Sequence, residues 1–146
     1  SAVKALKDLN INYLTVHISS GLAALKAVKK ISKCKIIGVS ILTSLNNKDL
    51  KMIGYSRSVK NLVAHQAKLA RRAKLDALVC SPFEVNIVRK IFKKEIITPG
   101  VQIGKKNYDQ KRSMEAKKVN SDWLVIGRSV TRGNIKKNIQ KLIKSL

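Results

Sequence analysis

"DALVCSPFEVNIVRKIFKKEIITPG", residues 76–100, combines a short apolar run, a longer helical pattern and a second apolar run. Both runs are continuously apolar rather than alternating, which is typical of parallel strands covered on both faces. The segment 82–94 between them predicts a helix that begins with an N-cap, a proline at the first position and a capping box, supplied by Ser81, Pro82 and Glu84. The stretch therefore predicts a strand, a helix and a second strand in succession.

The same alternation runs through the rest of the chain. Further strand-like runs occupy residues 13–17, 35–42 and 123–128. Helical patterns cover residues 21–32, 56–74, 112–120 and 133–146, and another stands in front at 1–9. Five repeated βα units predict an α/β fold with a parallel sheet, either open or closed into a (β/α)₈ barrel.

The length of the chain bears on this choice. Residues 1–146 contain no linker or low-complexity tract, so we expect a single domain. Five strands do not close such a barrel, and a full one takes about 250 residues. The chain also begins inside a helical pattern, without a methionine. We therefore expect about three further βα units in front of these residues in a longer protein.

The composition narrows the class of protein. Apolar residues make up 45% of the chain, which excludes a disordered polypeptide. No run reaches the roughly 18 apolar residues that a membrane span needs. Cys34 and Cys80 fit no metal spacing, and two free thiols are typical of a cytoplasmic protein.

The charge is strongly positive, with 31 basic and 8 acidic residues and a formal net charge of +23. Such an excess attracts polyanions, so nucleic-acid binding is one function to consider. The excess is mostly lysine spread along the chain, without an arginine-rich tract or alternation with aromatic residues. A lysine-biased coding background is the alternative explanation.

Ligands of parallel α/β proteins bind at the carboxyl ends of the strands. The segments there are rich in glycine, hydroxyl and amide side chains, and of the carboxylates only Asp49 and Asp109 lie near them. Neither a carboxylate pair nor a Ser-His-Asp arrangement is visible. An anion suits these segments better: Gly127 permits close backbone approach, and Arg128 offers two parallel hydrogen bonds, unless it points to water.

Other candidate groups have simpler interpretations. The irregular stretch 98–112 is either a loop that closes over a ligand or an ordinary surface loop. We expect His17 to be a buried structural residue at a strand end, His65 to be structural on a helix, and Cys80 to fill the core.

Several of these segments together resemble the orotidine 5′-phosphate decarboxylase family. The matching elements, in family order, are "TVHISSGLAAL", "VSILTSL", the "GYSRSV" helix, "LDALVCSP", "ITPGV", "DQKR" and "WLVIGRSVT". This resemblance covers essentially the whole chain. It implies a partial (β/α)₈ barrel holding about strands 4–8 of the family, and a homodimer.

The resemblance also implies substrate-binding residues. Thr43 of "LTSL" matches a position that contacts the pyrimidine, and Gln110 of "DQKR" matches a phosphate-contacting amide. Gly127 and Arg128 match the phosphate-binding backbone and guanidinium. Gln102 stands where the bacterial pattern has arginine, and Ser1 aligns with the threonine that closes the family's Asp-x-Lys-x-x-Asp segment.

That segment carries the family's chemistry, with a lysine that protonates the carbon that loses carbon dioxide. It precedes Ser1 in the resemblance, so no catalytic residue is assigned within residues 1–146, and we expect this chain alone to be inactive. The resemblance implies orotidine monophosphate as substrate, no metal or organic cofactor, no membrane and a cytoplasmic location. Two alternatives remain: a basic, non-catalytic RNA-binding descendant of the barrel, and a related sugar-phosphate synthase or decarboxylase.

Overall fold

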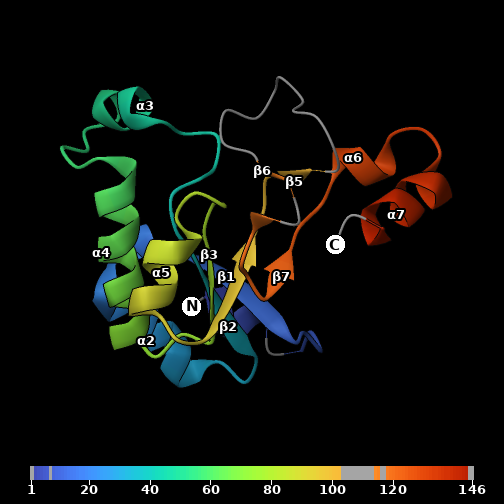
Figure 1. Ribbon diagram of the computed structural model, residues 1–146. Coiled ribbons are helices and arrows are strands. Elements are labelled where there is room, and N and C mark those ends of the chain that lie inside the picture. Colours follow the sequence, from blue (N-terminus) through green and yellow to red (C-terminus); the bar gives the residue numbers. More distant parts are fainter. Residues whose placement is uncertain (1, 7, 103–113, 116–117, 145–146) are drawn as a thin grey trace.

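The computed structural model describes residues 2–6, 8–102, 114–115 and 118–144. Five parallel strands form its main sheet in the order β1-β2-β3-β4-β7 (Figure 1). They are β1 (Tyr13–His17), β2 (Lys35–Val39), β3 (Ala77–Val79), β4 (Glu95–Thr98) and β7 (Trp123–Leu124). The strands therefore lie side by side in chain order, which confirms the predicted α/β fold built from repeated βα units.

Helices cover one face of this sheet. Figure 1 shows α2 (Gly21–Ile31), α4 (Val59–Arg72) and α5 (Val85–Ile91) packed as a layer beside the strands, with the turn η1 (Ile18–Ser20) leading into α2. The short helix α1 (Ala2–Ala5) precedes β1. The N-cap Ser58 starts α4 by accepting a hydrogen bond from the Asn61 N–H at 3.4 Å.

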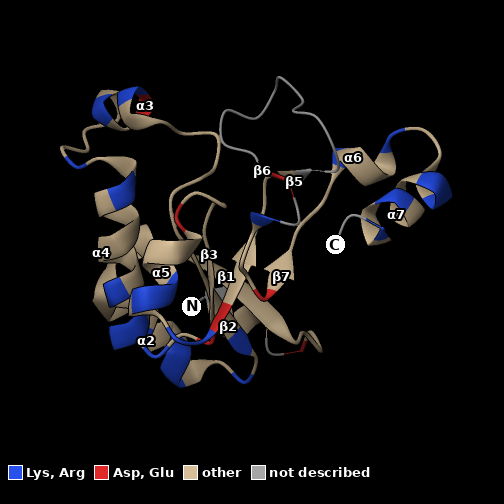
Figure 2. Cartoon of the chain, viewed as in Figure 1, with Lys and Arg blue, Asp and Glu red and all other residues tan. Residues whose placement is uncertain are grey.

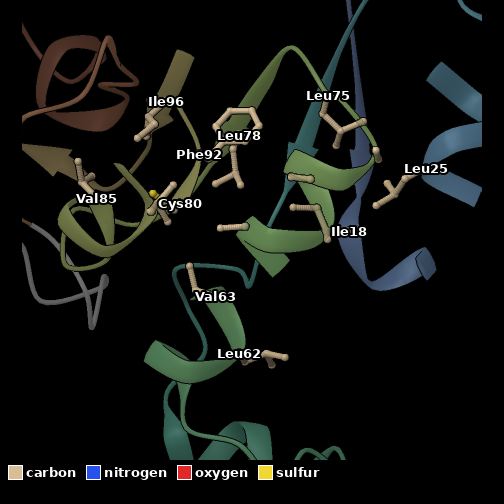
Figure 3. Packing of buried hydrophobic residues seen from close by; sticks show 14 of the residues in the cluster. Ile18, Leu25, Leu62, Val63, Leu75, Leu78, Cys80, Val85, Phe92 and Ile96 are labelled. Carbon is tan, nitrogen blue, oxygen red and sulfur yellow. The ribbon is translucent and has the colours of Figure 1, made fainter. Parts of the chain in front are cut away.

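The hydrophobic core lies between the sheet and this helical layer. Ile36, Leu78 and Ile96, one from each central strand, are fully buried against the helices. Leu25, Leu62, Val63, Val85 and Phe92 from the helical side belong to the same buried cluster, part of which Figure 3 shows around Leu78 and Ile96. Aliphatic packing dominates this interior, as the low aromatic content of 4% requires.

The opposite face of the sheet carries no helix among the described residues. Tyr13, Trp123 and Val125 on this side are 45%, 56% and 50% exposed. Helix α7 (Ile135–Ile143) packs against α6 (Arg128–Thr131) and exposes Ile135, Ile139 and Ile143. The prediction that both sheet faces are covered holds at the centre of the sheet, where Ile37 and Ala77 on this side are 7% and 1% exposed, and is wrong at the edge strands β1 and β7. The expected (β/α)₈ barrel would enclose this face of the sheet.

Several element boundaries differ from the sequence-based prediction. The helix expected at 82–94 begins at Val85, because Ser81–Glu84 form a turn in which the Glu84 N–H donates to the Ser81 carbonyl at 3.1 Å. The Ser81 hydroxyl still donates to the Glu84 carboxylate, so the two residues of the expected capping box meet without capping α5. Proline at the second position of a turn fits this arrangement.

The segment 112–120 does not form the expected helix where it is described. Met114–Glu115 form a strand, β6, which pairs in parallel with β5 (Val101–Gln102). The expected helix 133–146 begins at Ile135, where the Asn134 side chain caps the Lys137 N–H at 2.9 Å. An unexpected helix, α3 (Asn47–Met52), follows β2.

Two aspartates join neighbouring strands in the same way at the start of β3 and β7. The Asp76 carboxylate accepts the Ile36 N–H at 2.8 Å and pairs with Lys29, while Lys94 lies 3.6 Å from it. Burial alone would raise the pKa of Asp76, but the hydrogen bonds from Lys29 and the Ile36 N–H and the two lysine charges outweigh burial and lower it.

The second aspartate repeats this geometry. The Asp122 carboxylate accepts the Ile96 N–H at 2.7 Å and pairs with Arg89 at 2.6 Å. Burial opposes the charged form here as well, and the hydrogen bonds from the Ile96 N–H and Arg89 still lower the pKa of Asp122. Each aspartate thus joins the start of its own strand to the neighbouring strand and to the helix before that neighbour. Asp76 joins β3 to β2 and α2, and Asp122 joins β7 to β4 and α5.

Replacing Asp76 by asparagine is expected to lower the free energy of unfolding at neutral pH by about 1–3 kcal/mol, because Lys29 and Lys94 lose their carboxylate partner. A carboxyl group with a lowered folded pKa stabilises above its unfolded pKa and loses this effect as pH falls through the folded pKa. The difference between the two proteins is therefore expected to shrink below about pH 4. Urea unfolding across pH measures this, with exposed Asp8→Asn as the control. A difference independent of pH would contradict the assignment.

Candidate functional site

The carboxyl ends of the parallel strands gather at one end of the sheet. Figure 1 shows α3, the β5–β6 pair and α6 at this upper end, following β2, β4 and β7 respectively. Among the sequence-predicted site residues, Thr43, Gln102, Gly127 and Arg128 are described, and the backbone of all four lies at this end. Ser1 and Gln110 lie outside the described residues.

The end of β7 forms the first part of the candidate site. The Val125 N–H donates to the Thr98 carbonyl of β4 at 2.9 Å, which fixes the chain as it leaves the sheet. Gly127 is the N-cap of α6, and its carbonyl accepts the Val130 N–H at 2.9 Å. The helix expected to follow the phosphate-binding glycine is thus the short α6 rather than α7.

Gly127 and Arg128 are both exposed at the start of α6. Apart from Gly127 and its neighbours along the chain, no heavy atom lies within 4 Å of the position that a Cβ atom on Gly127 would occupy. The backbone is therefore accessible from this side, and the first N–H groups of a helix lack intrahelical acceptors. With the Arg128 guanidinium beside them, these groups can bind a phosphate dianion.

The end of β2 forms the second part of the candidate site. The buried Ser40 hydroxyl donates to the Val79 carbonyl of β3 at 2.7 Å and so ties the two strand ends together. Thr43 follows in a turn in which the Leu45 N–H donates to the Leu42 carbonyl at 3.0 Å, and it is half-buried. A threonine in this position can offer a hydroxyl group to a polar ring without carrying charge.

Helix α3 holds this turn in place through a complete capping box. The Asn46 side chain accepts the Asp49 N–H at 3.1 Å, and the Asp49 carboxylate accepts the Asn46 N–H at 2.8 Å. Asp49, one of the two carboxylates expected near the strand ends, therefore serves the helix start. Asparagine followed three residues later by aspartate is a capping-box pattern, and this pattern could have predicted α3 from the sequence.

Three strand spacings separate β2 from β7 in the sheet order. At about 4.8 Å per spacing, Thr43 and Arg128 follow strands that lie about 14 Å apart. Two polar groups at this separation, one neutral and one cationic, suit the two ends of an extended mononucleotide.

The remaining sequence-based predictions have mixed outcomes. Gln102 pairs through its backbone with Glu115, in β5 and β6. Of the stretch 98–112, residues 98–102 are described, so loop closure stays a prediction. His17 is exposed, and the prediction of a buried histidine is wrong because β1 turns this side chain to the face without helices. Cys80 is 1% exposed in the core, as expected.

The described carboxylates do not form an acid/base pair at this end of the sheet. Asp49 caps α3, and the buried Glu84 accepts the Ser81 hydroxyl. The sequence pattern places Ser81 at the end of the strand 76–80 and predicts Glu84 only as part of a helix cap; the structure places the Glu84 carboxylate against Ser81 after β3. Among the described residues, no group of three or more His, Cys, Asp or Glu side chains is arranged to hold a metal ion, and no helix has the length and apolarity to cross a membrane.

Residues 1–141 match the family described as "Orotidine 5'-phosphate decarboxylase / HUMPS family". The chain belongs to this family. It is 43% identical over 153 residues to the orotidine 5′-phosphate decarboxylase of the Wolbachia endosymbiont of Brugia malayi, covering 99% of this chain and 68% of the relative. The enzyme of Buchnera aphidicola from Schizaphis graminum is 38% identical and covers 100% of this chain and 67% of the relative. This chain of the orotidine 5′-phosphate decarboxylase family thus spans about two thirds of these relatives.

Solved structures of this family share the fold. Orotidine 5′-phosphate decarboxylase from Lactobacillus acidophilus superposes with a TM-score of 0.78 at 25% identity and covers 99% of this chain and 67% of its own. The structure from Methanocaldococcus jannaschii, complexed with the inhibitor BMP, has a TM-score of 0.71 at 21% identity. The described strands are therefore part of a (β/α)₈ barrel of this family.

Proposed function

We propose that the carboxyl ends of β2 and β7 bind the two ends of orotidine 5′-phosphate, which this decarboxylase family converts to UMP and carbon dioxide. Gly127 and Arg128 bind the phosphate, and Thr43 contacts the pyrimidine. The observation that carries this proposal is the position of a half-buried threonine and an exposed Gly-Arg pair at the same end of one parallel sheet.

Gln102, Gln110 and Ser1 complete the proposed substrate contacts. Gln102 lies at the end of β5, directly after the turn that follows β4. Gln110 follows it in the chain by eight positions. The contacts of Gln110 and Ser1 rest on the family resemblance.

The described residues supply binding rather than bond breaking. Breaking the bond between the ring and its carboxylate requires a proton donor at the ring carbon and groups that act on the departing carboxylate. The family resemblance assigns both to an Asp-x-Lys-x-x-Asp segment, a sequence that residues 1–146 do not contain. Phosphate binding remote from the reacting carbon helps by holding the substrate where it reacts.

The organisation of the whole protein is part of the proposal. We propose one domain over residues 1–146, which continues a barrel begun by upstream βα units, a homodimer and a cytoplasmic location. The exposed apolar side chains of Leu42, Met52 and Phe83, all after the ends of β2 and β3, offer surface for a second subunit. The free thiols of Cys34 and Cys80 support a reducing compartment.

Turnover tests the proposed function. Residues 1–146, joined to the upstream segment of the Wolbachia relative, are expected to convert orotidine monophosphate to UMP. Failure of a folded protein of this kind to do so would overturn the proposal.

A further inference from the structure

Three turns that lead from a helix into the next strand are unusually rich in cations. We define them as the basic turns: residues 29–35 between α2 and β2, 71–76 between α4 and β3, and 89–95 between α5 and β4. Their cations are Lys29, Lys30, Lys33, Lys35, Arg71, Arg72, Lys74, Arg89, Lys90, Lys93 and Lys94, against the two carboxylates Asp76 and Glu95. The three turns therefore hold a large share of the excess positive charge.

The basic turns lie together at one end of the molecule. Helix α4 packs against both α2 and α5, so the three turns follow one another in a row. Figure 2 shows the blue segments gathered at the lower ends of these helices, opposite α3 and α6. Packed helices lie about 8–10 Å apart, which gives the row a length of about 20 Å. Because the row lies at the opposite end of the sheet from Thr43 and Arg128, it does not serve the substrate site.

Ion pairs within the protein use only part of this charge. Lys29 and Lys94 pair with Asp76, Lys35 lies 3.5 Å from Glu95, and Arg89 pairs with Asp122. The remaining cations of the turns are exposed and make no ion pair with the described residues: Lys30, Lys33, Arg71, Arg72, Lys74, Lys90 and Lys93. A cation in the last turn of a helix interacts favourably with the negative end of the helix dipole. The basic turns contain more cations than this interaction would use.

The side chains between these cations indicate the partner. Leu75 and Phe92 are buried, and no exposed large apolar residue comes from these fully described turns. A membrane-binding surface inserts apolar side chains, and a base-reading surface stacks aromatic ones. A surface of cations alone fits a phosphodiester backbone. We propose that the basic turns bind the phosphate backbone of nucleic acid, without sequence preference and independently of the substrate site.

The test compares two variants of residues 1–146 with equal loss of charge. The first carries Arg71→Gln, Arg72→Gln, Lys90→Gln and Lys93→Gln in the basic turns. The control carries Lys136→Gln, Lys137→Gln and Lys141→Gln on helix α7 and Lys144→Gln at its C-cap. Glutamine retains helix propensity, and circular dichroism checks that both proteins fold.

Binding is measured by fluorescence anisotropy with a labelled, unstructured RNA oligonucleotide over a series of salt concentrations. The unaltered protein is expected to bind with a steep salt dependence. Each phosphate contact contributes about 0.7 to the slope of log affinity against log salt, so the first variant is expected to lose about 3 from this slope and at least about tenfold in affinity. The control variant is expected to stay within about twofold of the unaltered protein.

Three results would overturn the inference. Equal losses in both variants would assign binding to the diffuse charge of the chain rather than to the basic turns. Absence of salt-dependent RNA binding in the unaltered protein would exclude the interaction. Binding to phosphatidylserine vesicles in preference to RNA would assign the surface to a membrane.

Discussion

Replacing Arg128 by alanine, in a protein completed with the upstream segment of the Wolbachia relative, is expected to weaken binding of UMP by about 10²-fold or more, because two charge-assisted hydrogen bonds to phosphate are lost. Binding of uridine, which lacks the phosphate, is expected to change little. Isothermal calorimetry with both ligands measures the two affinities. The difference between them isolates the phosphate contact from any general effect on the site.

Arg132→Ala is the matched control. Arg132 is an exposed arginine at the end of α6, four residues after Arg128, and its removal changes the net charge equally. UMP binding is expected to stay within about threefold, because exposed charges a turn away are screened by salt. If Arg128→Ala weakened UMP and uridine equally, or if Arg132→Ala matched its effect, Arg128 would be one surface cation among many.

Joining residues 1–146 to an upstream Asp-x-Lys-x-x-Asp segment is expected to give a protein that decarboxylates orotidine monophosphate, and this change in rate is the largest effect that we expect. Residues 1–146 alone are expected to release no carbon dioxide from orotidine monophosphate above the uncatalysed rate, because they carry a binding site without the proton donor. The joined protein is expected to be active without added metal or cofactor. Release of labelled carbon dioxide measures both proteins.

The lysine of the added segment provides the control for this experiment. Its replacement by alanine is expected to lower the rate by about 10²–10⁴-fold or more, the usual contribution of a positioned proton donor. UMP affinity is expected to be retained, because the proposed phosphate contacts, Gly127 and Arg128, lie at the start of α6. Turnover by residues 1–146 alone would contradict the account, since it would require an acid/base group that the described site does not show.

Much of the fold follows from the sequence because parallel strands buried by helices leave a simple pattern. Continuous apolar runs that end at strand-breaking residues predicted β1, β2, β3, β4 and β7. In the sheet these five strands lie side by side in the order of the chain. Short elements were harder to predict. Strands β5 and β6 have two residues each, too few to show a period, and pairing between distant segments rather than local propensity decides them.

Local sequence patterns also did not predict which face of the sheet the helices would leave uncovered. Apolar residues on both faces predict burial on both, and Trp123 and Val125 are nevertheless exposed. The cause is tertiary: no helix among the described residues packs on this face, and a local pattern does not show which face a helix will cover. The exposure of His17 has the same origin, because its position on β1 directs it to that face.

The site was predicted in part, for a physical reason. Parallel topology brings all strand ends to one edge, so Thr43 and Arg128 were expected to share it, and they do. The sequence does not state the order of strands, which sets the separation between these residues. The repeated aspartates 76 and 122, which join neighbouring strands at the opposite, amino-terminal end of the sheet, carry no sequence signal beyond their place before a strand.

The central claim is that a nucleotide lies across the strand ends with its phosphate at Gly127–Val130 and its pyrimidine at Leu42–Leu45. Backbone amide chemical shifts of the completed protein, recorded with UMP and with uridine, test it most directly. Amides of 127–130 are expected to shift with UMP only, and amides of 42–45 with both ligands. Shifts confined to the basic turns, or identical shifts at 127–130 with uridine, would contradict the account.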